Sequence, residues 1–314
     1  MTTHYLSKDN GTNGFHTHLH PELRIAPGTG EKITFETDDE AYRQMHEFKA
    51  MDKVTATINP LTGPVYVEGA QPGDVLAVTI HDISFPSKVA WSVYLPGAGA
   101  LARPMGNEFY TREISLTDTH AQLTDKISVP IEPMIGCIGV AAADVTMSTV
   151  MPSYPTGGNM DLPDVTIGST VYLPIEVKGA LLYLGDLHAV MSRGESSFVA
   201  IEAAGEATVS IDLIKESSGS IMRLRAPRVE TASEIITVGL GDPVQNSIIM
   251  AYESLFDILT TDHGLTNEDA YTIMSASAHT ELGGPTGSRN PDPLHPFRAI
   301  GAVTLARIEK QYLT

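Results

Sequence analysis

The sequence predicts a mainly β protein, sandwich- or barrel-like, with a helical hairpin late in the chain, and therefore an α+β fold class. Short apolar runs, many of them alternating or β-branched, recur along the chain. Pro/Gly turns separate many of these runs. The long stretch with helical spacing of apolar residues begins only near residue 242. This order favours strands around a common core, with helices to one side.

Length and composition limit the classes of function. The chain has 314 residues, of which 42% are hydrophobic and 18% charged, as in a globular protein that can bury a substantial core. Its net charge of -18 argues against nucleic acid and anionic membranes as partners. A single cysteine allows no intrachain disulfide framework, which favours a reducing cytoplasm. We see neither a secretory signal nor an apolar run long enough to span a bilayer.

Turns and apolar runs alternate in the first half of the chain. Lys32–Thr37 alternates between apolar and polar side chains, which indicates a half-buried antiparallel strand. Val75–Ile83 is rich in β-branched residues and predicts a longer strand. The polar segment 38–58 is expected to be partly helical and to lie near the entrance of a site. Further strands are expected at Leu23–Ala26, Val65–Glu68 and 131–141.

The second half contains further strands before its helices. An apolar run from Ala180 to Leu184 predicts a buried strand that continues to Leu187. The segment 198–213 is expected to form a hairpin, and 221–240 a second pair of strands. A turn-rich segment and a final strand end the chain.

Two helices are expected between these strands and the final one. Asp242 followed by Pro243 is typical of a helix start, and apolar residues recur at helical spacing after it. Thr266 with Asp269 resembles a capping box for a short second helix at 267–276. Both helices are expected to serve as scaffold.

The strongest candidate site follows the apolar run at 180–184. Side chains two apart on a strand point to the same face, so Asp186 and His188 would project together, with Glu195 seven residues further on. Two carboxylates and an imidazole are typical of half a divalent-metal site with a base nearby. The alternative is an exposed turn or a hydrogen-bonded pair without a metal.

Other polar positions have both a functional and a structural interpretation. The alternating His16, His18 and His20 would share one face of a strand, with His20 next to a predicted strand. Glu202, within an apolar strand, must be paired, metal-bound or on a solvent face. Cys137 has no basic neighbour in sequence and is expected to be inert core. Several other residues either line a site or are ordinary surface, turn or core. They are Glu36, Trp91, Tyr94, the segment Gly157, Gly158, Asn159 and Asp161, and the pair His279 and Glu281.

The order and spacing of several stretches resemble the acetamidase/formamidase family over roughly residues 15–310. The stretches that carry the resemblance are ITFET (33–37), TGPVYVEGAQPGDVLAVTIHDI (62–83), GCIGVA (136–141), PTGGNMD (155–161), GALLYLGDLHAVMSRGE (179–195) and the helical hairpin 242–275. The resemblance implies a β-rich fold, a homo-oligomer (a homodimer or higher) and hydrolysis of short amides to carboxylate and ammonia. It also implies a divalent metal, zinc or calcium. The expected unit is one domain over 1–314, with a division into two β subdomains, about 1–150 and 151–314, left open.

The resemblance also suggests roles for individual residues. Asp186 and His188 are the expected metal ligands, with Glu36 or His20 completing the shell. Glu195 is the expected general base and acid. Asn159 or the backbone of Gly157–Gly158 is expected to hold the oxyanion, with Asp161 as a further substrate-binding residue.

The chain departs from the family pattern at two places near this site. The family usually carries Gln-Gly-x-Gly-Glu where this chain has Met191-Ser192-Arg193-Gly194-Glu195, and a Gly-Asp-like pair where it has Ala278-His279.

These departures leave other functions open. One is a non-catalytic small-molecule-binding protein that keeps a structural metal. A serine-nucleophile amidase would require a lysine pattern that the Gly-Ser pairs at 219–220 and 287–288 lack, and a nitrilase-like site would require Cys137.

Overall fold

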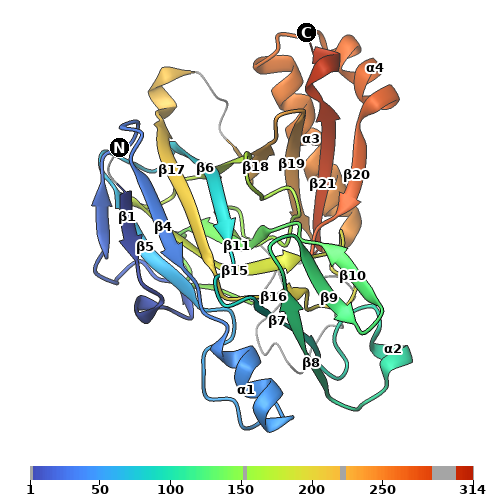
Figure 1. Ribbon diagram of the computed structural model, residues 1–314. Helices are drawn as coiled ribbons and strands as arrows, with labels where there is room; N and C mark the ends of the chain where they lie inside the picture. The colour runs from blue at the N-terminus through green and yellow to red at the C-terminus, as the bar shows by residue number, and fades with distance from the viewer. Residues whose placement is uncertain (1–2, 151–153, 220–223, 285–301, 314) are drawn as a thin grey trace.

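Two large β-sheets and a pair of late helices form the part of the protein that the computed structural model describes, residues 3–150, 154–219, 224–284 and 302–313 (Figure 1). Strands predominate over helices, and the sheets do not close into a barrel. The predicted α+β class is therefore confirmed, in its sandwich-like rather than its barrel-like form.

The first sheet has nine strands, and neighbouring strands are mostly antiparallel. β1 and β4 pair in parallel. Its spatial order is β1 (Thr3–Leu6), β4 (Lys32–Glu36), β17 (Glu206–Ile214), β6 (Val75–Ser84), β14 (Thr170–Pro174), β18 (Arg228–Glu230), β19 (Glu234–Gly241), β21 (Ala302–Glu309) and β20 (His279–Leu282).

The second sheet has ten strands and carries the candidate site. Its main path is β10 (Ile127–Pro130), β9 (His120–Thr124), β8 (Tyr110–Leu116), β7 (Val89–Tyr94), β16 (Ile201–Glu202), β15 (Ala180–Val190), β11 (Met134–Val140) and β13 (Gly157–Asn159). β5 (Leu61–Val67) also pairs with β15, and β3 (Leu23–Ile25) pairs with β5. A small separate sheet joins β2 (Gly14–Phe15) to β12 (Met147–Ser148).

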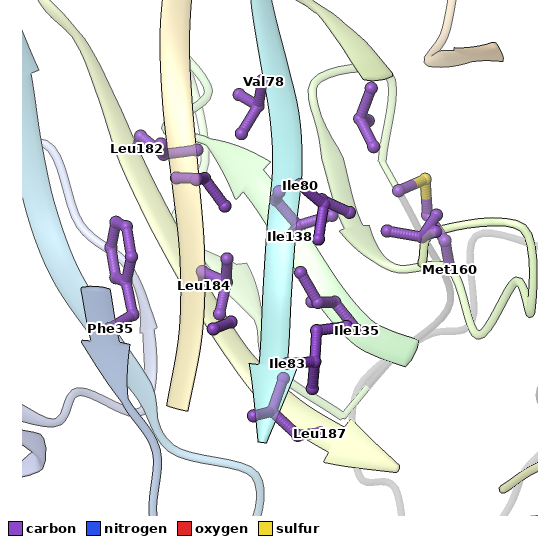
Figure 2. Packing of buried hydrophobic residues seen from close by; sticks show 14 of the residues in the cluster. Phe35, Val78, Ile80, Ile83, Ile135, Ile138, Met160, Leu182, Leu184 and Leu187 are labelled. Carbon is purple, nitrogen blue, oxygen red and sulfur yellow. The ribbon is translucent and has the colours of Figure 1, made fainter. Parts of the chain in front are cut away.

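The main hydrophobic core lies between the two large sheets. Figure 2 shows side chains of β4 and β6 packed against those of β11 and β15, with Ile80, Ile138 and Leu184 among them. All three are fully buried. β11 and β15 are buried almost throughout, which explains why their sequences are near-continuous apolar runs. The candidate site is therefore built on two strands that are buried on both faces.

The helices lie outside the two sheets. α3 (Val244–Thr261) packs on β19 and β21, and α4 (Asn267–Ser277) follows it at the same side of the molecule (Figure 1). Thr266 is confirmed as the N-cap of α4, since its Oγ1 accepts from the Asp269 amide at 3.1 Å, and the Asp269 carboxylate accepts from Thr266 Oγ1 at 2.8 Å. The segment 38–58 contains α1 (Glu40–Phe48), as expected, and α2 (Ala102–Met105) is short. The 3-10 turns are Lys8–Asn10, Glu216–Ser218 and Lys310–Leu313.

One strand prediction is wrong. The segment 198–213 is not a hairpin, because β16 pairs with β7 and β15 in one sheet while β17 pairs with β4 and β6 in the other. The chain crosses between the sheets at Gly205, where a Cβ would lie 2.3 Å from the Ser84 carbonyl oxygen. Alternation shows which face of a strand is buried, but not which sheet the strand joins.

The predicted strand pair at 221–240 is observed as β18 and β19, although residues 220–223 lie outside the described part. Both large sheets take strands from 1–150 and from 151–314, and the division into two subdomains stays a prediction. In the described residues, no helix combines the length and apolar character needed to cross a membrane.

Candidate functional site

Strand β15 carries Asp186 and His188 into the interior, as the D-x-H spacing predicts. Both side chains are buried. The facing strand β11 has Gly136 at this level, and a Cβ there would lie 2.6 Å from both Asp161 Oδ1 and Asp186 Oδ2. Any larger residue at 136 would therefore occupy the space that these two carboxylates fill.

Three further carboxylates reach the same place from other segments. Glu202 on β16 is the register partner of His188. Asp161 follows β13, and Glu195 lies in the loop after β15. We call this set of five the acidic cluster: Asp161, Asp186, His188, Glu195 and Glu202, all of them buried.

The acidic cluster converges on one nitrogen atom. His188 Nε2 lies 3.3 Å from Glu202 Oε2, 3.5 Å from Asp186 Oδ1 and 3.9 Å from Asp161 Oδ1. The potential ligand atoms of Asp161, Asp186 and His188 lie within 4.8 Å of one another, as do those of His188, Glu195 and Glu202. This spacing fits ligands arranged around one small cation.

Three members of the acidic cluster have left-handed backbone conformations. The φ angles are +47° at Asp161, +60° at Asp186 and +39° at Glu195. Non-glycine residues rarely adopt this region, and holding one there costs about 1–3 kcal/mol. Such strain persists where the surrounding structure fixes it, and it is concentrated at functional sites. Here it accompanies three carboxylates at one point.

The cluster carries more negative than positive charge. Burial and the neighbouring carboxylate of Asp186 raise the pKa of Asp161 well above its usual range. Burial and then Asp161 do the same to the pKa of Glu195. Burial also raises the pKa of Glu202, although the imidazole of His188 partly offsets this. Each shift shows how unfavourable four ionised carboxylates are at this spacing.

For His188, a raised pKa favours the charged form, whereas for the carboxyl groups it favours the neutral form. Burial lowers the pKa of His188, but the carboxylates of Glu202 and Asp186 outweigh this and raise it well above its usual value. Among the described residues, His188 is the basic group paired with the cluster's carboxylates. One imidazolium cannot balance four carboxylates.

Several buried polar atoms of the site have no hydrogen-bond partner in the structure. They are both carboxylate oxygens of Asp161, Glu195 Oε2, His188 Nδ1 and Asn159 Oδ1. Buried polar atoms are nearly always hydrogen-bonded, because leaving one unsatisfied costs about 1–3 kcal/mol. So many orphaned acceptors in one place indicate that the site is built to bind a cation and a polar ligand.

A second charged group lies beside the acidic cluster, and here every charge is paired. Asp164 accepts two hydrogen bonds from Arg193, at 2.7 and 3.0 Å, and one from Arg307 at 2.8 Å. Both arginines also donate to Glu281, and Arg307 donates to Glu234. We call this set the arginine network: Asp164, Arg193, Glu234, Glu281 and Arg307.

The arginine network joins three segments that border the acidic cluster. Asp164 lies three residues after Asp161, and Arg193 lies two residues before Glu195. Glu281 is on β20, just before Gly284, where a Cβ would lie 2.6 Å from the Asp161 Cβ and 2.9 Å from the Glu195 Cβ. The altered segment 191–194 is therefore tied to the site by its arginine.

A cavity of about 360 Å³ opens onto the acidic cluster. Four cluster carboxylates and Asn159 line its inner end, and α1 with the loop after it forms part of its wall, as expected for segment 38–58. Tyr42 on α1 donates a hydrogen bond to Asn59 at 2.7 Å, and burial raises its pKa well above the usual range, so its phenol is neutral. The arrangement gives a small ligand access to the cluster.

Some predicted site residues lie elsewhere. His20 is exposed, with Nδ1 3.0 Å from the carbonyl oxygen of Pro21. Glu36 accepts from Ser7 Oγ and the Lys8 amide on the N-terminal segment. Neither joins the acidic cluster: β4, which carries Glu36, belongs to the other sheet, and His20 lies on the surface between β2 of the small sheet and β3 of the site's own sheet. We therefore correct both assignments as ligands of this cluster.

The glycine pair is also not the oxyanion site that we predicted. The Gly157 amide donates to the Tyr154 carbonyl at 2.9 Å, and Gly158 pairs with Ile138 in the sheet. A Cβ at Gly157 would lie 2.5 Å from the Ile138 carbonyl oxygen, so close backbone approach accounts for glycine at this position. Asn159, by contrast, lines the cavity as predicted.

The remaining candidates have structural surroundings. Cys137 is buried core, and burial raises the pKa of its thiol well above the usual value, which argues against a thiolate nucleophile. Trp91 donates to Asp39, and Tyr94 to backbone carbonyls. His279 is exposed on β20. Ser220 and Ser288 of the Gly-Ser pairs lie outside the described residues.

Sequence reasoning underestimated two residues. For Glu202 the sequence leaves three roles open: paired, metal-bound or on a solvent face. For Asp161 it predicts contact with the substrate and not a place among the cation-binding carboxylates. A carboxylate within an apolar strand was the available signal for Glu202. Nothing local identifies Asp161, because its position depends on pairing between β13 and β11.

Comparison with known proteins identifies the family of this chain. The model of the acetamidase/formamidase family matches residues 2–141 and 97–282. This chain belongs to the acetamidase/formamidase family. It is 28% identical over 217 residues to a formamidase of Methylophilus methylotrophus, covering 51% of this chain and 52% of that protein. It is 26% identical over 270 residues to an acetamidase of Mycolicibacterium smegmatis, covering 65% and 66%. The chain thus spans about half to two thirds of the length of these relatives.

Solved structures of the acetamidase/formamidase family share the fold over nearly the whole chain. A predicted acetamidase/formamidase from the thermophile Thermoanaerobacter tengcongensis superposes with a TM-score of 0.86 at 26% identity, covering 99% of this chain and 97% of that one. An acetamidase from Bacillus halodurans gives a TM-score of 0.81 at 27% identity, covering 98% of both chains.

Proposed function

We propose that this protein hydrolyses the C–N bond of a linear carboxamide of the formamide or acetamide kind, releasing a carboxylate and ammonia, with a divalent cation held in the acidic cluster. The observation that carries the proposal is the set of buried carboxylate oxygens without partners at the inner end of an open cavity. The formamidase and acetamidase names of the relatives support the reaction class.

The residues present fit a divalent cation. Asp161, Asp186, His188 and Glu202 would hold it, since carboxylate oxygens and an imidazole suit zinc, and oxygen-rich sets suit calcium. When bound, such an ion polarises a carbonyl and lowers the pKa of a water molecule. Its charge would also offset the burial and the mutual repulsion that raise the pKa values of Asp161 and Glu202.

Glu195 is the residue best placed to move protons. Its Oε2 is buried without a partner, and Glu195 lines the cavity. Burial and the Asp161 carboxylate raise its pKa, which brings a carboxyl closer to the range in which it can both accept and release a proton. Glu195 would take a proton from the attacking water and pass it to the departing amine.

Asn159 would orient the amide. It lies on β13, buried at the inner end of the cavity, with Oδ1 unpartnered, so it can accept a hydrogen bond from a substrate NH₂ group. An NH₂ group is present in every primary carboxamide and absent from N-substituted ones, which makes this contact useful for recognising primary amides.

The test measures metal content and ammonia release together. The parent protein should contain a divalent metal and release ammonia from formamide or acetamide, whereas His188→Ala should lose both. His263→Ala, which changes an exposed histidine between α3 and α4, is the matched control and should retain both. Metal without ammonia release from any amide would instead favour the binding protein with a structural metal.

Three finer expectations go with this proposal. The metal is zinc or calcium, the protein forms a homo-oligomer, and it works in the cytoplasm. Elemental analysis, light scattering and cell fractionation test these expectations in turn. The net charge of -18 supports the expectation that neither nucleic acid nor anionic membrane is a partner.

A further inference from the structure

The cavity has two chemically different ends. Its inner end carries the cluster carboxylates and Asn159, where an amide group would bind. Away from that end, its walls are mostly apolar, with Met45, Met51, Ile58, Leu95, Phe198 and Val199 as the main contributors, although polar side chains such as Asn13, Thr57 and Thr149 also line it. Polar and apolar ends in one cavity match a ligand with a polar head and an apolar tail.

The cavity is also larger than the smallest amides require. Formamide has only a hydrogen on its carbonyl carbon, and acetamide only a methyl group. A cavity of about 360 Å³ lies within the range of roughly 300–1,000 Å³ that holds much larger organic ligands. Bound at the acidic cluster, either small amide would leave most of the apolar wall in contact with water.

The charges that line the cavity limit which acyl groups a bound amide can carry. No lysine or arginine is among the described residues that line the cavity, while four carboxylates are. An acidic tail would have no cation to pair with, and the cluster would repel it. Tyr42 is neutral, so it offers a hydrogen bond but no charge. The four carboxylates lie at the inner end, where the amide group would bind, so the mostly apolar wall offers a cationic tail no partner either, and the cavity suits an uncharged tail.

From this we infer a substrate class, which rests on the proposed function. We propose that the preferred substrates are neutral primary amides with a hydrocarbon acyl group, aliphatic or aromatic, of roughly four to eight carbons. The tail would displace water from the walls formed by α1, its following loop and the 195–199 loop. Met45 and Met51 have flexible side chains that can adapt to tails of different shape.

A homologous series of amides tests this inference. We would compare kcat/KM for ammonia release from formamide, acetamide, butyramide, hexanamide and benzamide. We expect kcat/KM to rise about fourfold per buried methylene up to the length that fills the cavity. Highest kcat/KM with formamide or acetamide would overturn this inference and leave the proposed function intact. Ammonia from none of the five would overturn both.

A variant that fills the cavity provides a second test. Ala56 lies in the loop after α1, lines the cavity and is partly exposed, so Ala56→Phe should be tolerated by the fold. We expect it to lower kcat/KM for hexanamide at least about tenfold more than for acetamide. Ala232→Phe, in the exposed turn between β18 and β19, is the matched control and should change neither value.

An enlarging variant gives the opposite change and does not depend on Ala56→Phe folding. Met51→Ala should move the best substrate toward a longer acyl chain. Equal losses for all chain lengths in both variants would contradict a binding role for this wall. Thermal unfolding of each variant shows whether a loss comes from misfolding.

Discussion

The acidic cluster and the arginine network lie side by side, and their charged groups are paired to very different extents. In the network, two arginines and three carboxylates satisfy one another with hydrogen bonds of 2.6–3.0 Å. In the cluster, four carboxylates share one imidazole, and several oxygens have no partner. Complete pairing is what a structural support requires, whereas incomplete pairing is what a binding site keeps available.

The largest expected contrast between the two regions is in catalysis. Glu195→Gln should reduce ammonia release by about 10²–10⁴-fold, because an amide cannot take up and release the proton. Glu281→Gln, in the arginine network, should reduce it far less. The measurement is kcat for the best amide at fixed metal content. Activity of Glu195→Gln within tenfold of the parent would remove Glu195 from the proton-transfer role.

The next contrast is in stability. Arg307 is buried and pairs with three carboxylates, so Arg307→Met should destabilise the fold by about 3–5 kcal/mol. Arg225 also makes two ion pairs, but it is exposed, and Arg225→Met should cost no more than about 1 kcal/mol. Denaturant unfolding measures both. Similar costs for the two variants would show that burial is not what makes the network important.

A third experiment concerns a substitution that should stabilise the fold instead of destabilising it. In protein stripped of metal by a chelator, Asp161→Asn should increase the free energy of unfolding by about 1–3 kcal/mol, because it removes a buried negative charge beside the carboxylate of Asp186. With metal restored, the same variant should be less stable than the parent, since a ligand is lost. If Asp161→Asn destabilised the metal-free protein, the cluster would be better balanced than its geometry indicates.

The smallest expected effect is on how the stability of the fold changes at acidic pH. Burial raises the pKa of Asp164, but the guanidinium groups of Arg193 and Arg307 outweigh it and hold the pKa below its usual value. A carboxyl with a lower pKa in the folded state contributes stability above its ordinary pKa of about 4, and that stability is lost as the pH falls through the folded value. Asp164→Asn should therefore lose less stability than the parent between about pH 5 and pH 3. Parallel unfolding curves against pH would contradict this.

The sequence predicted local structure well because local structure depends on nearby residues. Periodicity and capping predict three local features: the buried strand at 180–187, the helix cap at Thr266 and the helical segment near the cavity. The D-x-H spacing also placed Asp186 and His188 correctly on one buried face. Each of these features depends only on the residues of one strand or helix and on which of its faces is buried.

Features that depend on sheet order were not predictable in the same way. Glu202 reaches His188 only because β16 leaves β17 and joins the other sheet, and the same partition keeps Glu36 away. The segment around Gly157 resembles an anion-binding loop in sequence, yet the Gly157 amide donates to the carbonyl of Tyr154 in the turn before β13. No pattern within one segment reports which distant strand it pairs with, so this part of the site required the structure.

The left-handed backbone at Asp161, Asp186 and Glu195 has a consequence for directed evolution of this fold. Glycine or asparagine at these positions would relax the chain and remove repelling charge at the same time. A library screened in metal-free form and only for survival on heating should therefore accumulate replacements at these three sites early, and its most heat-resistant clones should be inactive. Screens for durable variants need a turnover assay at every round.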